Sequence, residues 1–257
     1  MTRMITDTPV PTVRRLVINR PEKRNALDQE TKAALFQTFA EAETDPSVRC
    51  IVLSGSGGAF CSGGDLTTME GQTEQDALAR MRHGHQFVSS VFRSRKPLIA
   101  AVEGVASGAG VALALLNDFV VAGCSSKFSF PFIKLGLIPD WGLMHTLPSR
   151  VGLQTARKLM MTAATVDARE AERLGLVDFV VDDGEVQNHS LELAQDLASR
   201  PRAALAMLKG GLRLAAPSIE SVLEYEAIAQ TTCFIGAEFK EGFSAFRDKR
   251  PSNYTSI

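Results

Sequence analysis

Short apolar runs alternate with helix-like stretches from the start of the chain to about Leu147. Helical patterns separate these apolar runs. The first helical pattern begins after Asp28, a typical N-cap residue, and ends near Asp45-Pro46. Another helical pattern covers about Thr73–Phe92, and a glycine- and alanine-rich helix ends near Asn117. Buried strands alternating with helices predict an α/β fold with a mostly parallel sheet. The apolar runs that predict strands are Thr12–Asn19, Val48–Leu53, Pro97–Val102 and Phe119–Ala122.

The pattern becomes mainly helical after about Leu147, and only Leu176–Val181 is typical of a strand there. The apolar faces of the last helices exceed what one chain can easily bury, which predicts assembly into an oligomer. The predicted helices are Leu153–Met161, Ala168–Leu174, Val186–Ala198, Ala203–Leu214, Ile219–Cys233 and Phe239–Phe246.

Composition narrows the class of protein. The 257 residues include 28 Lys+Arg and 29 Asp+Glu, giving a net charge of −1, with 45% hydrophobic and 22% charged residues. These proportions are typical of a globular protein. Binding of nucleic acid normally requires a basic stripe, and the near-neutral net charge argues against such a partner. Residues 1–10 have no apolar core of a secretory signal, and the stretch 104–116 is too short to cross a bilayer, so we expect a cytoplasmic protein without membrane insertion. The four cysteines have no metal-ligand spacing.

Two glycine-rich turns follow predicted strands, at residues 55–64 and 104–110. The second does not complete a dinucleotide fingerprint because Leu113 stands where glycine is required, and Ser107 lies outside a nucleophile elbow. Main-chain amides at both turns could instead converge on one anion, since the second turn leads into a helix N-terminus. Such a pair of amides would form an oxyanion hole; alternatively, the glycines are only tight turns.

Five segments in order along the chain resemble the crotonase superfamily, the enoyl-CoA hydratase/isomerase family. The resemblance implies a core of stacked ββα turns over residues 1–195 and a C-terminal helical region over 196–257 that forms trimers or dimers of trimers. It also implies an acyl-CoA thioester as substrate, and no cofactor beyond the coenzyme A that the substrate carries. The matching segments are Asn19–Leu27, Gly58–Leu66, Lys96–Gly110, Leu135–Asp140 and Glu241–Arg250.

The family's oxyanion-hole positions match Ser62 and Ala109 in this sequence, which implies that their amides bind the thioester oxygen. Asp65 is also a natural N-cap for the turn Leu66–Met69, and we favour that role over catalysis. Phe246 and Lys249 match a helix that covers CoA, sometimes from a neighbouring subunit. The positions matching acyl-CoA-binding residues are Lys23, Arg24, Ala26, Ser62, Gly63, Gly64, Asp65, Leu66, Gly108, Ala109, Phe132, Phe246 and Lys249.

The sequence departs from the family's hydratases at both catalytic glutamates, whose positions hold Ala112 and Phe132. Neither side chain can activate a water molecule. Asp140 is the remaining carboxylate, at a place where several family isomerases and benzoyl-CoA dehalogenases have an aspartate. Its apolar neighbours Leu137, Ile138 and Trp141 should bury it and raise its pKa.

One carboxylate beside an oxyanion hole suits a 1,3-proton shift that converts a Δ3-enoyl-CoA to the Δ2 isomer, with Asp140 moving the proton. In another interpretation Asp140 only caps the next helix. The alternatives for function are a hydratase with Asp140 as its sole acid and base, an aryl-CoA dehalogenase with Asp140 as nucleophile, and a non-catalytic acyl-CoA-binding protein.

Overall fold

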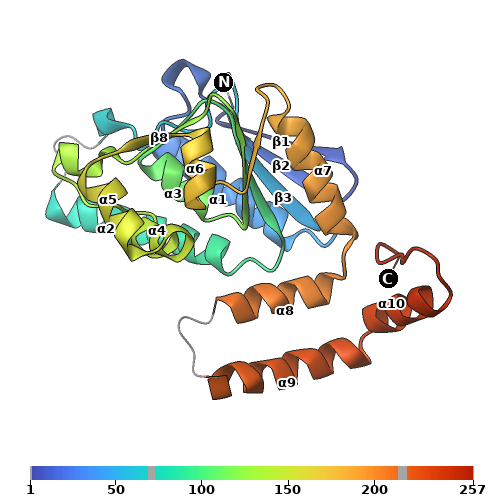
Figure 1. Cartoon of the computed structure of the whole chain (residues 1–257). Coiled ribbons are helices and arrows are strands. Elements are labelled where there is room, and N and C mark those ends of the chain that lie inside the picture. Colours follow the sequence, from blue (N-terminus) through green and yellow to red (C-terminus); the bar gives the residue numbers. More distant parts are fainter. Residues whose placement is uncertain (1, 69–72, 214–218, 257) are drawn as a thin grey trace.

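The chain folds around a twisted sheet of six strands in the order β1-β2-β3-β4-β6-β9 (Figure 1). The structure is a computed structural model that describes residues 2–68, 73–213 and 219–256. Strand β1 pairs antiparallel with β2 at one edge, and the other neighbours are parallel. A small sheet has the order β5-β7-β8. The strands are β1 (Met4–Val10), β2 (Val13–Ile18), β3 (Cys50–Gly55), β4 (Leu98–Val102), β5 (Val105–Ser107), β6 (Phe119–Gly123), β7 (Lys127–Ser129), β8 (Thr165–Asp167) and β9 (Phe179–Val181).

Helices cover both faces of the main sheet. Helix α7 packs its Val186, Ala194 and Ala198 on one face, and α1 and α3 contribute to the larger core on the other. The α-helices are α1 (Gln29–Thr44), α2 (Glu74–Phe92), α3 (Ala109–Leu115), α4 (Leu143–Val151), α5 (Leu153–Met161), α6 (Ala168–Leu174), α7 (Val186–Ser199), α8 (Arg202–Leu212), α9 (Ile219–Ile235) and α10 (Ala237–Arg247). The 3-10 helices within the described ranges are η1 (Pro21–Lys23), η2 (Leu66–Thr68) and η3 (Pro131–Leu135).

The predicted α/β fold and its main elements are confirmed. The Asp28 side chain accepts the Thr31 N–H and starts α1, and α2 begins with a capping box at Thr73. The predicted helix Ala203–Leu214 is α8, although Leu214 itself lies outside the described residues. The prediction missed β1, whose polar, exposed residues and Pro9 are typical of an edge strand, and the three short strands of the small sheet.

The C-terminal helices extend away from the body of the molecule. Figure 1 shows α8 beneath the body, with α9 and α10 still farther from the main sheet. Large apolar side chains are exposed on these helices, including Leu212 (78%), Ile235 (74%) and Phe246 (85%). This exposure agrees with the apolar excess seen in the sequence, while assembly into trimers stays a prediction. Within the described residues, no helix combines the length and apolar character needed to cross a membrane.

Candidate active site

The two glycine-rich turns lie side by side and are joined by main-chain hydrogen bonds. Cys61 N–H donates to the Val105 carbonyl at 3.0 Å, and Ser107 N–H donates to the Cys61 carbonyl at 3.0 Å. A Cβ atom on Gly63 would stand 2.7 Å from the Ser107 carbonyl oxygen and 3.6 Å from the Ala109 nitrogen. Only glycine therefore fits at position 63, which also has a φ of 102°. The contact brings the first turn next to the Ala109 amide.

The Ala109 amide occupies the first position of α3, where N–H groups have no intrahelical acceptor. The preceding Gly108 has a φ of 54° and turns the chain from β5 into the helix. A Cβ on Gly110 would stand 2.1 Å from the Cys61 carbonyl oxygen, so the start of α3 can approach the first turn only without a side chain there. This geometry fits the predicted role of Ala109 as an amide donor.

The Ser62 amide already has a main-chain acceptor in this structure. Ser62 N–H donates to the Arg24 carbonyl at 2.9 Å, and Ser62 Oγ donates to the Lys23 carbonyl at 3.1 Å. Arg24 adopts the left-handed conformation, with a φ of 48°, at the end of η1. A substrate oxygen that is to bind the Ser62 amide must therefore share or replace the Arg24 carbonyl, and the catalytic role of Ser62 stays a prediction.

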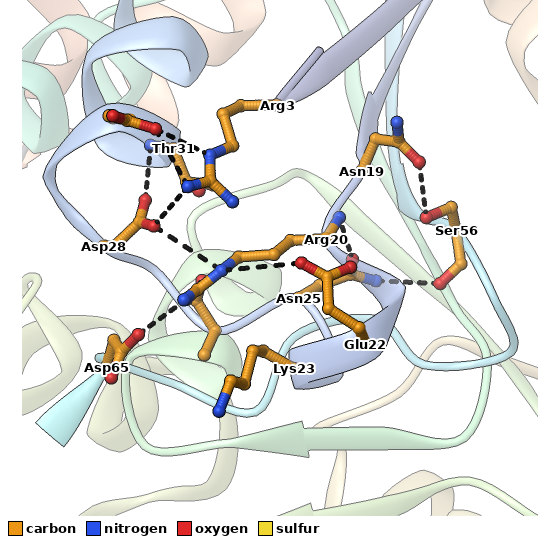
Figure 2. Close-up of polar contacts among 12 residues, drawn as sticks. Arg3, Asn19, Arg20, Glu22, Lys23, Asn25, Asp28, Thr31, Ser56 and Asp65 are labelled. Atoms are coloured by element: carbon orange, nitrogen blue, oxygen red, sulfur yellow. Dashed lines mark hydrogen bonds and ion pairs between the residues drawn. The ribbon is translucent and has the colours of Figure 1, made fainter. Parts of the chain in front are cut away.

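A network centred on Arg20 ties the segment 20–28 to the first glycine-rich turn (Figure 2). Arg20 Nη1 lies 2.7 Å from Asp65 Oδ2 and donates to the Ala26 carbonyl at 3.1 Å, while Arg20 Nε lies 3.5 Å from Asp28 Oδ2. The side chains of Arg20 and Asp65 are each only 11% exposed. Asp65 also accepts the Thr67 N–H at 3.1 Å. Hydrogen bonds from Thr67 and Arg20 lower the pKa of Asp65 to about 2, so it is ionised.

Asp65 therefore caps η2, as predicted, although Met69 of the predicted turn lies outside the described residues. The buried Asn25 adds a second link, because its amide donates to the carbonyls of Ser56 at 2.9 Å and Ala59 at 2.6 Å (Figure 2). Gly64 forms a parallel bridge with Leu27. These contacts fix the predicted acyl-CoA-binding segments 23–26 and 62–66 against each other.

Asp140 lies in the segment between η3 and α4, which packs against α1 and α2. The following residue, Trp141, is 6% exposed and places its ring 6.1 Å from the ring of Phe36 and 5.8 Å from that of Phe87. Leu137 and Ile138 are 44% and 70% exposed, so they do not bury Asp140 as the sequence suggested. Its burial comes from the helices that hold Trp141.

Asp140 is half-buried, and its Oδ1 atom is buried. Oδ1 has no hydrogen-bond partner among the residues that the structure describes. Helix α4 has Gly142 as its N-cap and no side-chain capping bond, so the capping alternative for Asp140 is wrong. Burial raises the pKa of Asp140, and the positive charges of Lys32, Arg80 and His85 and a main-chain bond act against that rise. A buried acceptor with a raised pKa is suited to receiving and returning a proton.

The two positions that match the hydratase glutamates are apolar and buried. Ala112 is 0% exposed in α3, and Phe132 is 7% exposed in η3. The Phe132 ring reaches the second glycine-rich turn, since its Cζ atom would be 3.9 Å from a Cβ on Gly108. The surroundings of the Ala109 amide therefore hold a phenyl ring where a hydratase has a carboxylate.

Two charged residues of the site were missed from the sequence. Arg20 lies 45 positions from its partner Asp65, and no local pattern predicts that pair. Lys32 is 8% exposed in α1, and burial lowers its pKa to about 8. The signal was available for Lys32, because it stands one turn before Leu35 and Phe36 on the predicted apolar face.

Other predicted residues lie at the edge of the site or far from it. The side chains of Lys23 and Arg24 are exposed, as expected for a contact with phosphate, and Leu66 is 52% exposed. Phe246 and Lys249 lie on and just beyond α10, which Figure 1 places away from α3. Their contact with CoA, in this subunit or from a neighbouring one, stays a prediction.

Known proteins resemble this chain over nearly its whole length. The family model described as enoyl-CoA hydratase/isomerase matches residues 11–256. The chain is 35% identical to a 1,2-epoxyphenylacetyl-CoA isomerase of Escherichia coli, over 93% of this chain and 94% of that protein. It is 33% identical to a crotonyl-CoA hydratase of Syntrophomonas wolfei, over 94% of each chain.

The fold agrees with these sequence matches. The crystal structure of an enoyl-CoA hydratase from Bacillus anthracis superposes with a TM-score of 0.94 at 27% identity, covering 99% of this chain and 100% of that one. An enoyl-CoA hydratase from Polaromonas gives 0.92 at 31% identity, covering 97% and 98%. The chain has the crotonase fold and belongs to the enoyl-CoA hydratase/isomerase family.

Proposed function

We propose that this enzyme is an acyl-CoA double-bond isomerase that uses Asp140 as its only acid and base. The observation that carries the proposal is the buried Oδ1 atom of Asp140, which has no partner in the described part of the chain, in a site whose two hydratase positions hold Ala112 and Phe132. The similarity to a 1,2-epoxyphenylacetyl-CoA isomerase supports isomerase chemistry. No water has to be activated in a proton shift, so the apolar residues at both positions are compatible with it.

In the proposed mechanism the carboxylate of Asp140 removes a proton from C2 of a Δ3-enoyl thioester. The electrons move onto the thioester oxygen as a dienolate, which accepts hydrogen bonds from the amide of Ala109 and from that of Ser62 once the Arg24 carbonyl is replaced. Asp140, now protonated, delivers the proton to C4 and leaves the conjugated Δ2-enoyl-CoA. The carboxylate is regenerated, so the reaction needs no other proton donor.

The direct test is an assay with a Δ3-enoyl-CoA on the wild-type enzyme and the Asp140→Asn variant. We expect kcat to fall by about 10² to 10⁴ in the variant, which is the usual contribution of a general acid or base. The melting temperature should hold or rise, because a neutral amide then replaces a carboxylate whose Oδ1 has no partner. Undiminished turnover in the variant would remove Asp140 from the mechanism.

The same enzyme preparation distinguishes the alternatives. The similarity to a crotonyl-CoA hydratase makes hydration of crotonyl-CoA the second reaction to measure. A hydration rate above the isomerisation rate would favour a hydratase with Asp140 as sole acid and base. Release of halide from a haloaryl-CoA would favour nucleophilic attack by Asp140, and tight binding without turnover of any thioester would favour a binding protein.

A further inference from the structure

Lys32 is a buried cation on the face of α1 that meets the Asp140 segment. Residues four positions apart share one face of a helix, so Lys32 lies in line with Phe36. The Phe36 ring packs 6.1 Å from that of Trp141, the residue after Asp140. Lys32 is 8% exposed. Helix geometry and the aromatic contact therefore place this side chain beside the carboxylate segment.

The Lys32 ammonium has no hydrogen bond or ion pair to any residue in the described part of the chain. Asp28, one turn earlier, is the natural partner, but its carboxylate already accepts the Thr31 N–H at 2.8 Å and lies 3.0 Å from Arg3 and 3.5 Å from Arg20. Lysine is almost never buried without a partner, because desolvating its charge is unfavourable. Lys32 therefore bears the desolvation of its charge without a direct partner, which makes it a candidate for a role toward Asp140.

Among the described groups, Lys32 and Asp140 exert the largest attractive influence on each other. Burial and the nearby Arg80 lower the pKa of Lys32 to about 8, and Asp140 is the largest attractive influence on it. Among the charges that oppose the raised pKa of Asp140, Lys32 comes first, ahead of Arg80 and His85 on α2. The two groups attract each other without a direct ion pair, which leaves Asp140 Oδ1 free.

Arg80 and His85 also act on Asp140, but both are less buried than Lys32. Arg80 is only partly buried and donates to the Thr68 carbonyl at 3.1 Å. His85 is exposed on α2. Burial raises the pKa of the Cys61 thiol to about 12, so the thiol is neutral and carries no charge toward Lys32.

We propose that Lys32 is a positioning residue that keeps the Asp140 carboxylate ionised between proton transfers while leaving its oxygen free to accept the substrate proton. This inference rests on the proposed function, in which Asp140 is the base. A direct ion pair would occupy the oxygen that has to take the proton, whereas a charge held at a distance favours the ionised form without blocking it.

The test compares Lys32→Met and Lys32→Gln, which remove the charge, with Lys32→Arg, which keeps it, and with Lys158→Met, which removes an exposed charge on α5. Removing the positive charge raises the pKa of Asp140. We therefore expect the acid limb of the pH profile of kcat/KM to move upward by about one pH unit in the neutral variants. Lys32→Arg and Lys158→Met should keep the wild-type limb.

A second measurement does not need turnover. Carbon-13 carboxyl signals of labelled aspartate, with the Asp140 signal identified by its loss in Asp140→Asn, report the Asp140 titration directly. We expect that signal to titrate about one pH unit higher in Lys32→Met, and the melting temperature to hold or rise. This outcome supports the role of Lys32 even if no Δ3-enoyl-CoA is isomerised, in which case only the proposed function fails.

An unmoved Asp140 titration in the neutral variants would overturn the inference. Loss of the fold in both Lys32→Met and Lys32→Gln would also overturn it, because Lys32 would then serve the structure of α1. The Asp140 titration could also be shifted in Lys32→Arg as much as in the neutral variants. Asp140 would then require the shape of the lysine and not its charge, and the inference would again be overturned.

Discussion

The amide side of the active site, around Gly63 and Ala109, is held by main-chain hydrogen bonds, whereas the carboxylate side, around Asp140, is held by packing of Trp141 between two helices. On the first side Gly63 and Gly110 are fixed by the close approach of two backbones. On the second side the carboxylate has an unpartnered oxygen and is surrounded by charges. The amide side is therefore fixed by backbone geometry, and the carboxylate side by side-chain packing and charge.

The largest expected effect is the loss of the amide side in Gly110→Ala. The new Cβ would stand 2.1 Å from the Cys61 carbonyl oxygen, so the two turns must separate. We expect the free energy of unfolding to fall by about 4 kcal/mol or more and isomerase activity to vanish. Chemical denaturation monitored by circular dichroism measures the change.

Gly84→Ala is the matched control, because Gly84 lies inside α2 with nothing within 4 Å of its Cβ position. This variant should be stabilised by about 0.5 to 1 kcal/mol. Equal stability of the two variants would contradict the role assigned to the close approach at Gly110.

Arg20→Met should give the next largest effect, because it leaves the buried carboxylates of Asp65 and Asp28 without their shared cation. We expect a loss of about 3 kcal/mol in the free energy of unfolding. Arg3→Met is the control, since Arg3 also binds Asp28 but is 27% exposed, and it should cost less than about 1 kcal/mol. An equal loss of unfolding free energy in both variants would show that Arg20, at the centre of the network in Figure 2, stabilises the amide side no more than Arg3 does.

The smallest expected effect is a pH dependence that comes from Asp65. Its pKa is lowered from 3.8 to about 2 in the folded protein, so its contribution to stability is complete above about pH 4 and is lost as the pH falls toward 2. The free energy of unfolding should decline over this range in the wild type. The decline should be shallower in Asp65→Asn, as measured by urea denaturation at several pH values; an equally steep decline in that variant would assign the effect to other carboxylates.

The amide side and the carboxylate side also differ in how well the sequence predicts them. The helices that begin at Asp28 and Thr73 were predicted because a capping residue precedes an amphipathic pattern. The two glycine-rich turns were predicted to lie together, and the structure joins them. These features depend on local sequence or on a family pattern.

The contacts that were missed depend on residues far apart in the chain. The pairing of Arg20 with Asp65 and the approach of Lys32 to Asp140 arise only when α1, α2 and the segment before α4 pack together. The occupation of the Ser62 amide is of the same kind, because its acceptor is on the loop at Arg24. Sequence patterns identify the residue types, but tertiary packing decides which of them meet.

The hydrogen bond from Ser62 N–H to the Arg24 carbonyl has a consequence for selectivity during catalysis. An internal acceptor competes with any incoming oxygen for that amide. A neutral thioester carbonyl gains little by displacing an equally neutral peptide carbonyl, whereas an oxygen that has acquired negative charge forms a hydrogen bond about twice as strong. In the proposed mechanism the loop at Arg24 would therefore make this donor respond to charge development, and its benefit would fall on turnover more than on affinity for the ground state.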